Sequence, residues 1–98
     1  MSALPVVAVM TAKEGSVDVL RDALTALVAP TRAEEGCLSY ELYESSSSPG
    51  VFVTIESWRD MADLDAHMET EHIAQTFAVA GDALAGPPAI HPLTRIDG

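Results

Sequence analysis

The sequence predicts an α+β protein with a ferredoxin-like βαββαβ order, in which helices cover one face of a four-stranded antiparallel sheet. Three kinds of pattern support this prediction. Short valine-rich or alternating segments indicate strands, and longer segments with an apolar residue at every third or fourth position indicate helices. A turn rich in serine, proline and glycine joins two of the strands as an antiparallel hairpin. With 98 residues, the chain has room for a single domain, residues 1–98.

The first strand and the first helix are predicted from the N-terminal third of the chain. Residues 5–12 (PVVAVMTA) are apolar and rich in valine, as in a buried strand. Ser16 is a suitable N-cap for the following helix, in which leucines recur at helical spacing. Pro30 has no backbone N–H and its ring crowds the preceding turn, so we expect the helix to end or kink near Ala29.

A β-hairpin is predicted in the middle of the chain. Residues 37–44 alternate, with Leu38, Tyr40 and Leu42 on one face and Ser39, Glu41 and Tyr43 on the other. The run SSSSPG at residues 45–50 indicates a turn. Residues 51–58 alternate again, with Val51, Val53 and Ile55 on one face and Phe52, Thr54, Glu56 and Trp58 on the other.

Two shorter helices and a last strand complete the order. Asp60 is a suitable N-cap for one helix and Thr70 for the next. The second of these helices carries one apolar stripe, formed by Ile73, Phe77, Ala80 and Leu84. Gly86 and two prolines then end it, and residues 89–96 are expected to form the last strand.

The apolar content predicts a homodimer. Hydrophobic residues make up 48% of the sequence. This is more than one small core hides, because a domain of this size buries only about 60–65% of its unfolded surface. Both faces of the predicted hairpin carry apolar side chains, whereas the helices would cover only one of them. We therefore expect two copies to pack sheet to sheet around a barrel-like interior.

The charge pattern disfavours several classes of partner. The net charge is −10 and the five basic residues stand singly along the chain, so neither nucleic acid nor an anionic membrane surface is an expected partner. No apolar run approaches the roughly 20 residues of a membrane span, and we expect no secretory signal. The single cysteine, Cys37, cannot form an intrachain disulfide. These features predict a cytoplasmic protein.

The candidate catalytic residues are His67, His72 and Glu56. An imidazole titrates nearest neutral pH and often serves as a general base. His67 lies beside apolar residues of a helix, where it is either a hydrogen-bonded structural residue or a base. His72, near the start of the next helix, is placed to cap it, to pack or to face a cavity. Glu56 is expected on a covered face, where a buried carboxylate needs a partner: a histidine that it orients, or a structural ion pair or hydrogen bond.

The candidate substrate-binding residues are aromatic or sulfur-containing. Trp58 shares the predicted strand face of Glu56, where it either packs in the core or forms a flat wall for an aromatic substrate. Tyr40, Phe77 and Met68 are interpreted as core residues that also line a pocket.

Neither a metal nor an organic cofactor is expected. His67 and His72 are five residues apart, which does not place them on one helix face, and Thr70 is expected to break the helix between them. No cluster of cysteines and histidines has the spacing of metal ligands. No G-x-G-x-x-G segment follows a strand, so dinucleotide or flavin binding has no support.

Together these residues resemble the antibiotic biosynthesis monooxygenase family, which includes the small quinol monooxygenases. The resemblance covers essentially the whole chain and rests on residues 34–42 (EEGCLSYEL), Phe52, Glu56-Ser57-Trp58, Leu64, His67 and His72. It implies a dimeric ferredoxin-like α/β barrel. The family includes oxygenases that use no metal or organic cofactor, isomerases, haem-degrading enzymes and proteins without known activity. It therefore fixes the fold more firmly than the reaction.

The resemblance implies a cofactor-independent monooxygenase that oxidises a small aromatic hydroquinone or a polyketide-like phenol with O₂. In this hypothesis His67 or His72, aided by Glu56, removes a phenolic proton. The resulting anion passes one electron to O₂, and the two radicals recombine. The same base would serve an isomerase or cyclase by enolisation. A non-catalytic binding module, in which these residues only pack and cap helices, is the third interpretation.

Overall fold

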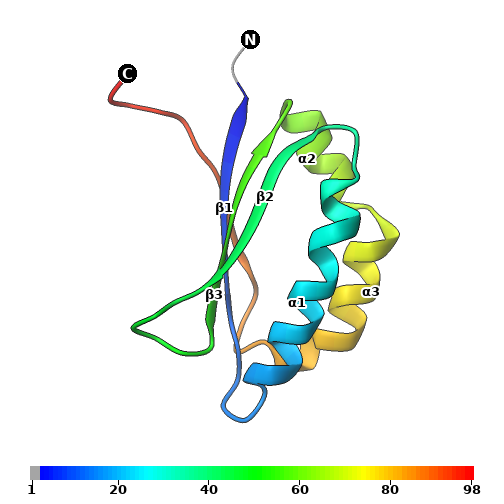
Figure 1. The fold of residues 1–98 in the computed structure, drawn as a ribbon, viewed down its shortest axis with the longest axis vertical. Helices are drawn as coiled ribbons and strands as arrows, with labels where there is room; N and C mark the ends of the chain where they lie inside the picture. Colours follow the sequence, from blue (N-terminus) through cyan, green and yellow to red (C-terminus); the bar gives the residue numbers. More distant parts are fainter. Residues whose placement is uncertain (1–2) are drawn as a thin grey trace.

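The computed structural model describes residues 3–98, in which helices cover one face of a four-stranded antiparallel sheet (Figure 1). The strands are β1 (Leu4–Thr11), β2 (Cys37–Glu44), β3 (Val51–Trp58) and β4 (Ala89–Pro92). The helices are α1 (Val17–Arg32), α2 (Met61–Met68) and α3 (Glu71–Ala80), and a 3-10 turn follows at Gly81–Ala83. The strand order β2-β3-β1-β4 confirms the predicted ferredoxin-like α+β fold. No helix in the described range is long and apolar enough to cross a membrane.

The core lies between the sheet and the helices. Every second side chain of β1 and β3 is buried there: Val6, Ala8 and Met10 on β1, and Phe52, Thr54, Glu56 and Trp58 on β3. Leucines of α1 pack over the same face. The alternation predicted for β3 is therefore confirmed. It places two polar side chains, Thr54 and Glu56, inside an otherwise apolar layer, where each requires a hydrogen-bond partner.

The junction between α2 and α3 follows the predicted capping residues. Asp60 caps α2 by accepting a hydrogen bond from the backbone N–H of Asp63 at 3.0 Å. Thr70 caps α3, since its Oγ1 accepts from the N–H of Ile73 at 3.4 Å. The same hydroxyl donates to the carbonyl of His67 at 2.8 Å. One side chain therefore joins the end of α2 to the start of α3.

The end of α1 differs from the sequence-based expectation. Pro30 lies inside the helix, which continues to Arg32. Proline removes only one hydrogen bond this close to a helix end. The last turn is held from outside the helix, because Arg32 Nε donates to the carbonyl of Tyr40 at 2.9 Å. A contact to β2 thus outweighs the local preference of Pro30.

The sheet differs from expectation at two of its edges. In β2 the pairing register with β3 shifts between Cys37 and Ser39, so Leu38 does not share the face of Tyr40 and is exposed. In β4 the strand ends at Pro92 instead of residue 96. The backbone N–H of Leu93 still donates to the carbonyl of Pro5 at 2.9 Å, and the chain then leaves the edge of the sheet.

The helix over residues 71–84 is also shorter than predicted. It ends at Ala80 and gives way to the 3-10 turn, which leaves Leu84 outside the helix. Leu84 instead forms an isolated antiparallel bridge with Ala12 and packs against the core. Ile73 and Ala80 are buried and Phe77 is partly buried, whereas the last member of the stripe, Leu84, reaches the core from a loop.

The second face of the sheet is open and mainly apolar, with Glu41 opposite Ile55 and His91 opposite Val7. Its cross-strand neighbours are Val7, Val9, Val53, Ile55 and Tyr43. Ile55 is 49% exposed and Tyr43 54% exposed. This is the surface from which a sheet-to-sheet homodimer is predicted, and the dimer stays a prediction.

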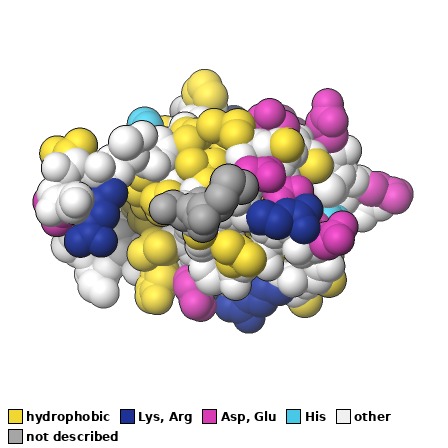
Figure 2. Space-filling model, turned by 90° about the horizontal axis from the view of Figure 1, so that it is seen from above, with side chains coloured by type: hydrophobic (Ala, Val, Ile, Leu, Met, Phe, Trp, Pro, Cys, Tyr) yellow, Lys and Arg dark blue, Asp and Glu magenta, His cyan; other side chains and the backbone are white. Residues whose placement is uncertain are grey.

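Acidic side chains dominate the charged surface, as the net charge of −10 requires. Figure 2 views the end of the molecule that carries the chain termini. Most of the acidic side chains visible there lie on the helix side, and basic side chains are few and separate. Such a surface repels anionic partners at long range.

Two carboxylates of this surface are paired with arginines. Glu44 accepts from Arg21 Nη2 at 2.8 Å and from the backbone N–H of Gly50 at 3.1 Å. Both contacts hold the pKa of Glu44 below its ordinary value, and the Gly50 N–H has the larger effect on this pKa. Asp63 accepts from Arg59 Nε at 2.7 Å, which lowers the pKa of Asp63 in the same way.

Candidate functional site

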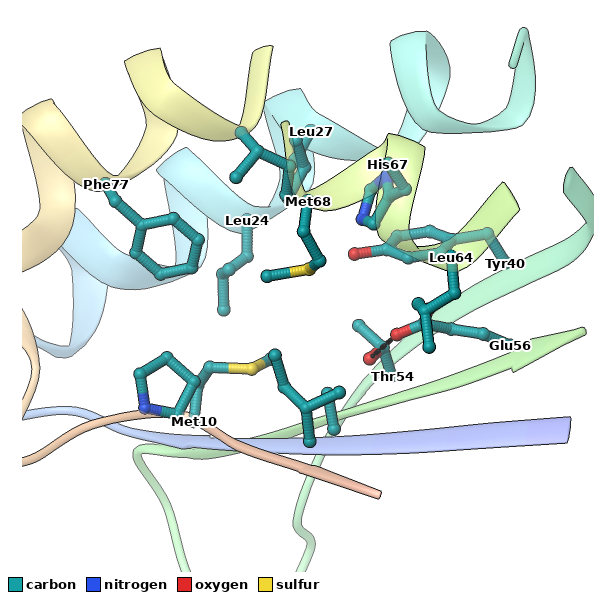
Figure 3. A pocket seen from close by; sticks show the side chains of 14 residues that line it. Met10, Leu24, Leu27, Tyr40, Thr54, Glu56, Leu64, His67, Met68 and Phe77 are labelled. Atoms are coloured by element: carbon teal, nitrogen blue, oxygen red, sulfur yellow. Dashed lines mark hydrogen bonds between the residues drawn. The ribbon is translucent and has the colours of Figure 1, made fainter. Parts of the chain in front are cut away.

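A cavity of about 30 Å³ lies between the sheet and the helices, and every strand and α-helix contributes to its wall. The two ends of the cavity differ in chemistry (Figure 3). The polar end is formed by Tyr40, Thr54, Glu56 and His67. The apolar end is formed by aliphatic, sulfur-containing and aromatic side chains, among them Met10, Leu24, Met68 and Phe77. A polar group at one end of a buried apolar pocket is typical of a small-molecule site.

His67 is the imidazole of the cavity. It occupies the last turn of α2, and only 3% of it is exposed. Its Nδ1 lies 2.6 Å from Oε2 of Glu34, in the connection between α1 and β2. Because a carboxylate accepts, this contact assigns the ring proton to Nδ1 and leaves Nε2 as a hydrogen-bond acceptor. Figure 3 shows the ring edge beside the Tyr40 hydroxyl, on the cavity side.

His72 binds the same carboxylate from the outside. Its Nε2 lies 2.8 Å from Glu34 Oε2, and its ring centroid is 6.1 Å from that of His67. It does not line the cavity, and its side chain is 25% exposed. We call Glu34, His67 and His72 the Glu34–histidine cluster. The cluster extends from the cavity wall to the protein surface.

Glu56 has different partners from those expected of a catalytic dyad. Its Oε2 accepts from Thr54 Oγ1 at 2.6 Å, and its Oε1 accepts from Trp58 Nε1 at 2.8 Å. Of the two partners considered for Glu56, the structure shows structural hydrogen bonds and no contact to a histidine, and the histidines instead contact Glu34. The physical reason is the strand geometry, since residues 54, 56 and 58 point to one face and satisfy each other locally.

Trp58 lies behind the cavity wall. It is fully buried, and its ring centroid is 4.7 Å from that of His67. It does not line the cavity, so it is not placed to form the wall for a substrate that the sequence suggested. Its N–H holds Glu56, and its ring supports His67.

Tyr40 brings a hydroxyl to the polar end of the cavity. It is 4% exposed, and its ring centroid is 6.0 Å from that of His67. Burial, reinforced by the charge of Glu56, raises the pKa of Tyr40 well above its ordinary value. The hydroxyl therefore stays protonated around neutral pH and remains a donor.

Met68 and Phe77 line the apolar end, as the sequence suggested. Met68 is 39% exposed, whereas Leu24 and Met10 are buried. The cavity therefore approaches the surface near Met68, and the partly exposed Ile90 of β4 also lines it. An unbranched methionine side chain at this position changes rotamer easily.

Glu34 is the functional candidate that sequence reasoning did not single out. It lies 33 residues from His67 and 38 from His72. No local period links positions so far apart, and only its place in the EEG segment before β2 marked it. The spacing argument against bringing the two histidines together is also overturned, because the helix break at Thr70 turns both rings toward Glu34.

The family model described as Antibiotic biosynthesis monooxygenase matches residues 4–79. The chain belongs to this family. A Mycobacterium tuberculosis protein named "Putative monooxygenase Rv0793" is 41% identical over 78 residues, which cover 80% of this chain and 76% of that protein. The Escherichia coli protein named "Probable quinol monooxygenase YgiN" is 35% identical over 72 residues, covering 64% of this chain and 69% of the relative.

Solved structures agree with the architecture. The crystal structure of PA3566 from Pseudomonas aeruginosa superposes with a TM-score of 0.90 at 38% identity, covering 98% of this chain and 96% of that one. The structure of Rv0793 superposes with a TM-score of 0.87 at 36% identity, covering 99% and 98% of the two chains. The fold predicted from the sequence and its family are therefore both confirmed.

Proposed function

We propose that this member of the family is a cofactor-independent monooxygenase of small aromatic hydroquinones or phenols, with His67 as the base. The observation that carries the proposal is the free Nε2 of a buried imidazole at the polar end of an apolar cavity. Similarity to a relative named as a quinol monooxygenase supports the substrate class. Glu34 replaces Glu56 as the carboxylate that positions the base.

The residues of the polar end suit the removal of a phenolic proton. His67 Nε2 accepts the proton from the substrate O–H, and the Glu34 carboxylate stabilises the resulting imidazolium through Nδ1. The protonated Tyr40 hydroxyl is close enough to the base to donate a hydrogen bond to the new phenolate oxygen. Glu56 is held away from this role by its own two donors.

In the remaining steps O₂ is the oxidant, so the electrons and atoms balance without a cofactor. The phenolate passes one electron to O₂, which gives a phenoxyl radical and superoxide. The two radicals join at a ring carbon, and the new peroxide anion takes the proton held by His67. Loss of water then leaves the quinone, so that one oxygen atom of O₂ enters the product and the other leaves as water. The protein contributes deprotonation, positioning and a water-poor cavity.

The cavity must widen to hold an aromatic ring. Its volume of about 30 Å³ is far below the roughly 300 Å³ at which ligand pockets begin. The side chains that separate it from the surface include Met68, which is 39% exposed. Rotation of Met68 away from Phe77 opens the apolar end, and a small planar substrate then reaches the base with its hydroxyl first.

The electrostatic surroundings favour a neutral substrate. The cavity wall carries Glu56 and contains neither lysine nor arginine. The protein has a net charge of −10, so a carboxylated or phosphorylated substrate would be repelled at long range and left without a cation inside the cavity. A phenolic hydroxyl ionises only after it binds beside His67.

The test is oxygen consumption with a panel of neutral hydroquinones and phenols. We expect uptake by the wild type and a loss of at least about 100-fold in His67→Gln, the range for removal of a general base. Circular dichroism of the variant controls for folding. Absence of uptake by the folded wild type across the panel, or an unimpaired His67→Gln, would contradict the proposal.

An isomerase or cyclase is the second candidate, because the same base in the same cavity would also serve enolisation. Product formation from a carbonyl substrate in anaerobic buffer distinguishes it from an oxygenase. A non-catalytic binding module predicts tight binding of aromatic compounds with neither product nor oxygen uptake.

We also propose that the protein is a homodimer that packs through the open sheet face. Support comes from the exposed apolar side chains of that face, among them Ile55 and Tyr43. Sedimentation equilibrium at micromolar concentration should give a dimer, and Ile55→Lys should give a monomer. A monomeric wild type would contradict this assembly.

A further inference from the structure

The Glu34–histidine cluster has the ligand set of a transition-metal site. We infer that Glu34, His67 and His72 bind a divalent ion of the zinc type and that binding blocks the proposed base. The blocking part rests on the proposed function, whereas the binding part does not. The ion would reach the cluster from the surface and not through the cavity.

The donor atoms are suitable in kind and number. Two imidazole nitrogens and one carboxylate oxygen, a set found in zinc sites, lie within 4.8 Å of one another. Zinc bonds of about 2 Å place ligand atoms about 3.4 Å apart in a tetrahedral site. Glu34 Oε2 is now 2.6 Å and 2.8 Å from the two nitrogens, as hydrogen bonding requires. To admit an ion, the carboxylate must move away from the rings and the exposed His72 ring must move towards His67, because donor atoms up to 4.8 Å apart are wider than a tetrahedral site allows.

The three ligands come from separate segments that allow this adjustment. Glu34 lies in a connection, His67 in the last turn of α2 and His72 in the first turn of α3. The side chains of Glu34 and His72 are 15% and 25% exposed, which gives an ion access from solvent. The buried His67 supplies the fixed wall of the site.

The charge of the cluster also favours a cation. Within residues 3–98, the side-chain contacts of Glu34 are the two histidines, and no lysine or arginine pairs with it. Its neighbour Glu35 differs, since it lies 3.9 Å from Arg59. No lysine or arginine side chain of the described residues therefore competes with a metal ion for the Glu34 carboxylate.

Metal binding changes the tautomer of His67. In the metal-free protein the ring proton is on Nδ1, facing Glu34. A neutral imidazole that ligates a metal through Nδ1 carries its proton on Nε2. No proton is lost, but the nitrogen facing the cavity becomes a donor and no longer accepts a substrate proton. Occupation of the site therefore stops the proposed reaction.

Calorimetric titration of the chelator-treated protein with Zn²⁺ tests the binding. We expect one ion per chain and at least a tenfold loss of affinity in His72→Ala and in Glu34→Gln. His91→Ala is the matched control, because His91 is the exposed histidine of β4 and should leave the affinity unchanged. Co²⁺ provides a second probe through the visible absorption of a tetrahedral site. Absence of stoichiometric binding, or equal losses in His72→Ala and His91→Ala, would overturn the site.

Nitrogen-15 NMR of the histidine rings tests the effect on His67 without any activity measurement. Addition of Zn²⁺ should move the ring proton of His67 from Nδ1 to Nε2. If the wild type consumes oxygen, addition of Zn²⁺ should lower its rate of oxygen uptake at least tenfold. An unchanged tautomer would overturn the blocking mechanism even if zinc binds, and a zinc-bound protein with full activity would do the same.

Discussion

The two carboxylates near the cavity, Glu56 and Glu34, occupy opposite kinds of surroundings. Glu56 is held by Thr54 and Trp58, neutral donors two residues away on its own strand. Glu34 is held by two imidazoles that lie 33 and 38 residues away. The donors of Glu56 do not titrate near neutral pH, so its region behaves as fixed structure. The partners of Glu34 are imidazoles, side chains that can take up and release a proton, so the proposed chemistry is assigned to its region.

The largest expected effect tests the chemical side of this comparison. Glu34→Gln should lower kcat about 100-fold in metal-free buffer, because a neutral amide stabilises the imidazolium of His67 less than a carboxylate does. KM should change little, since Glu34 does not line the cavity. The rate of oxygen uptake measures both constants.

Glu35→Gln is the matched control for this prediction. Its side chain is 89% exposed and lies next to Glu34 in the chain. Equal losses of kcat in Glu34→Gln and Glu35→Gln would remove the distinction between the two carboxylate regions.

The second-largest expected effect tests the structural role of the Glu56 region. Trp58→Phe removes the donor to Glu56 Oε1 and leaves a buried carboxylate oxygen unsatisfied. We expect the free energy of unfolding to fall by about 1–3 kcal/mol. Urea denaturation followed by circular dichroism measures it. Tyr43→Phe, on the open face, should leave the stability nearly unchanged, and an equal loss in both variants would contradict the assigned role of Trp58.

A smaller effect is expected at the apolar end of the cavity, away from both carboxylates. Met68→Ala should open the cavity and lower KM several-fold for hydroquinones with one added ring substituent, since one methylene in a pocket is worth about 1–3 kcal/mol. Met61→Ala is the control, because Met61 lies on the same helix with 46% exposure and does not line the cavity. If Met61→Ala changes KM as much as Met68→Ala does, Met68 does not control access.

The smallest effect concerns an exposed carboxylate and extends the comparison to the surface. The folded-state pKa of Glu44 is lowered by the Gly50 N–H and by Arg21. Its contribution to stability is therefore present above the ordinary value of 4.5 and is lost as the pH falls through the lower folded-state value. Glu44→Gln should be less stable than the wild type in urea at pH 7, and the difference should vanish near pH 3. A difference that persists at low pH would show that the ion pair is not its origin.

The Glu56 region was largely predictable from the sequence, and the Glu34 region was not. Strand alternation places Glu56 and Trp58 on one buried face, and their partners lie on the same strand, so a two-residue period contains the relevant information. The capping roles of Asp60 and Thr70 were also predictable, because they depend on side chains within three residues. The contacts of Glu34 depend on how α1, α2 and α3 meet, and no local pattern encodes that meeting.

The errors in the fold have the same origin. Pro30 was expected to end or kink α1 near Ala29 on local grounds, but the helix continues to Arg32, which holds the last turn through the backbone of Tyr40. Leu38 was assigned to the same face as Tyr40 by simple alternation, and one irregularity in β2 turns it outward. In each case a contact between distant segments outweighs a local preference.

The last turn of α2 carries two consecutive residues with separate tasks. His67 faces the polar end of the cavity, and Met68 lies at its opening. The Thr70 hydroxyl bonds this turn to the start of α3 through the carbonyl of His67. Any displacement of the turn as a unit therefore moves the side chains of Met68 and His67 together. Under the proposed function, substrate entry and alignment of the proton acceptor would thus be mechanically linked through one peptide bond.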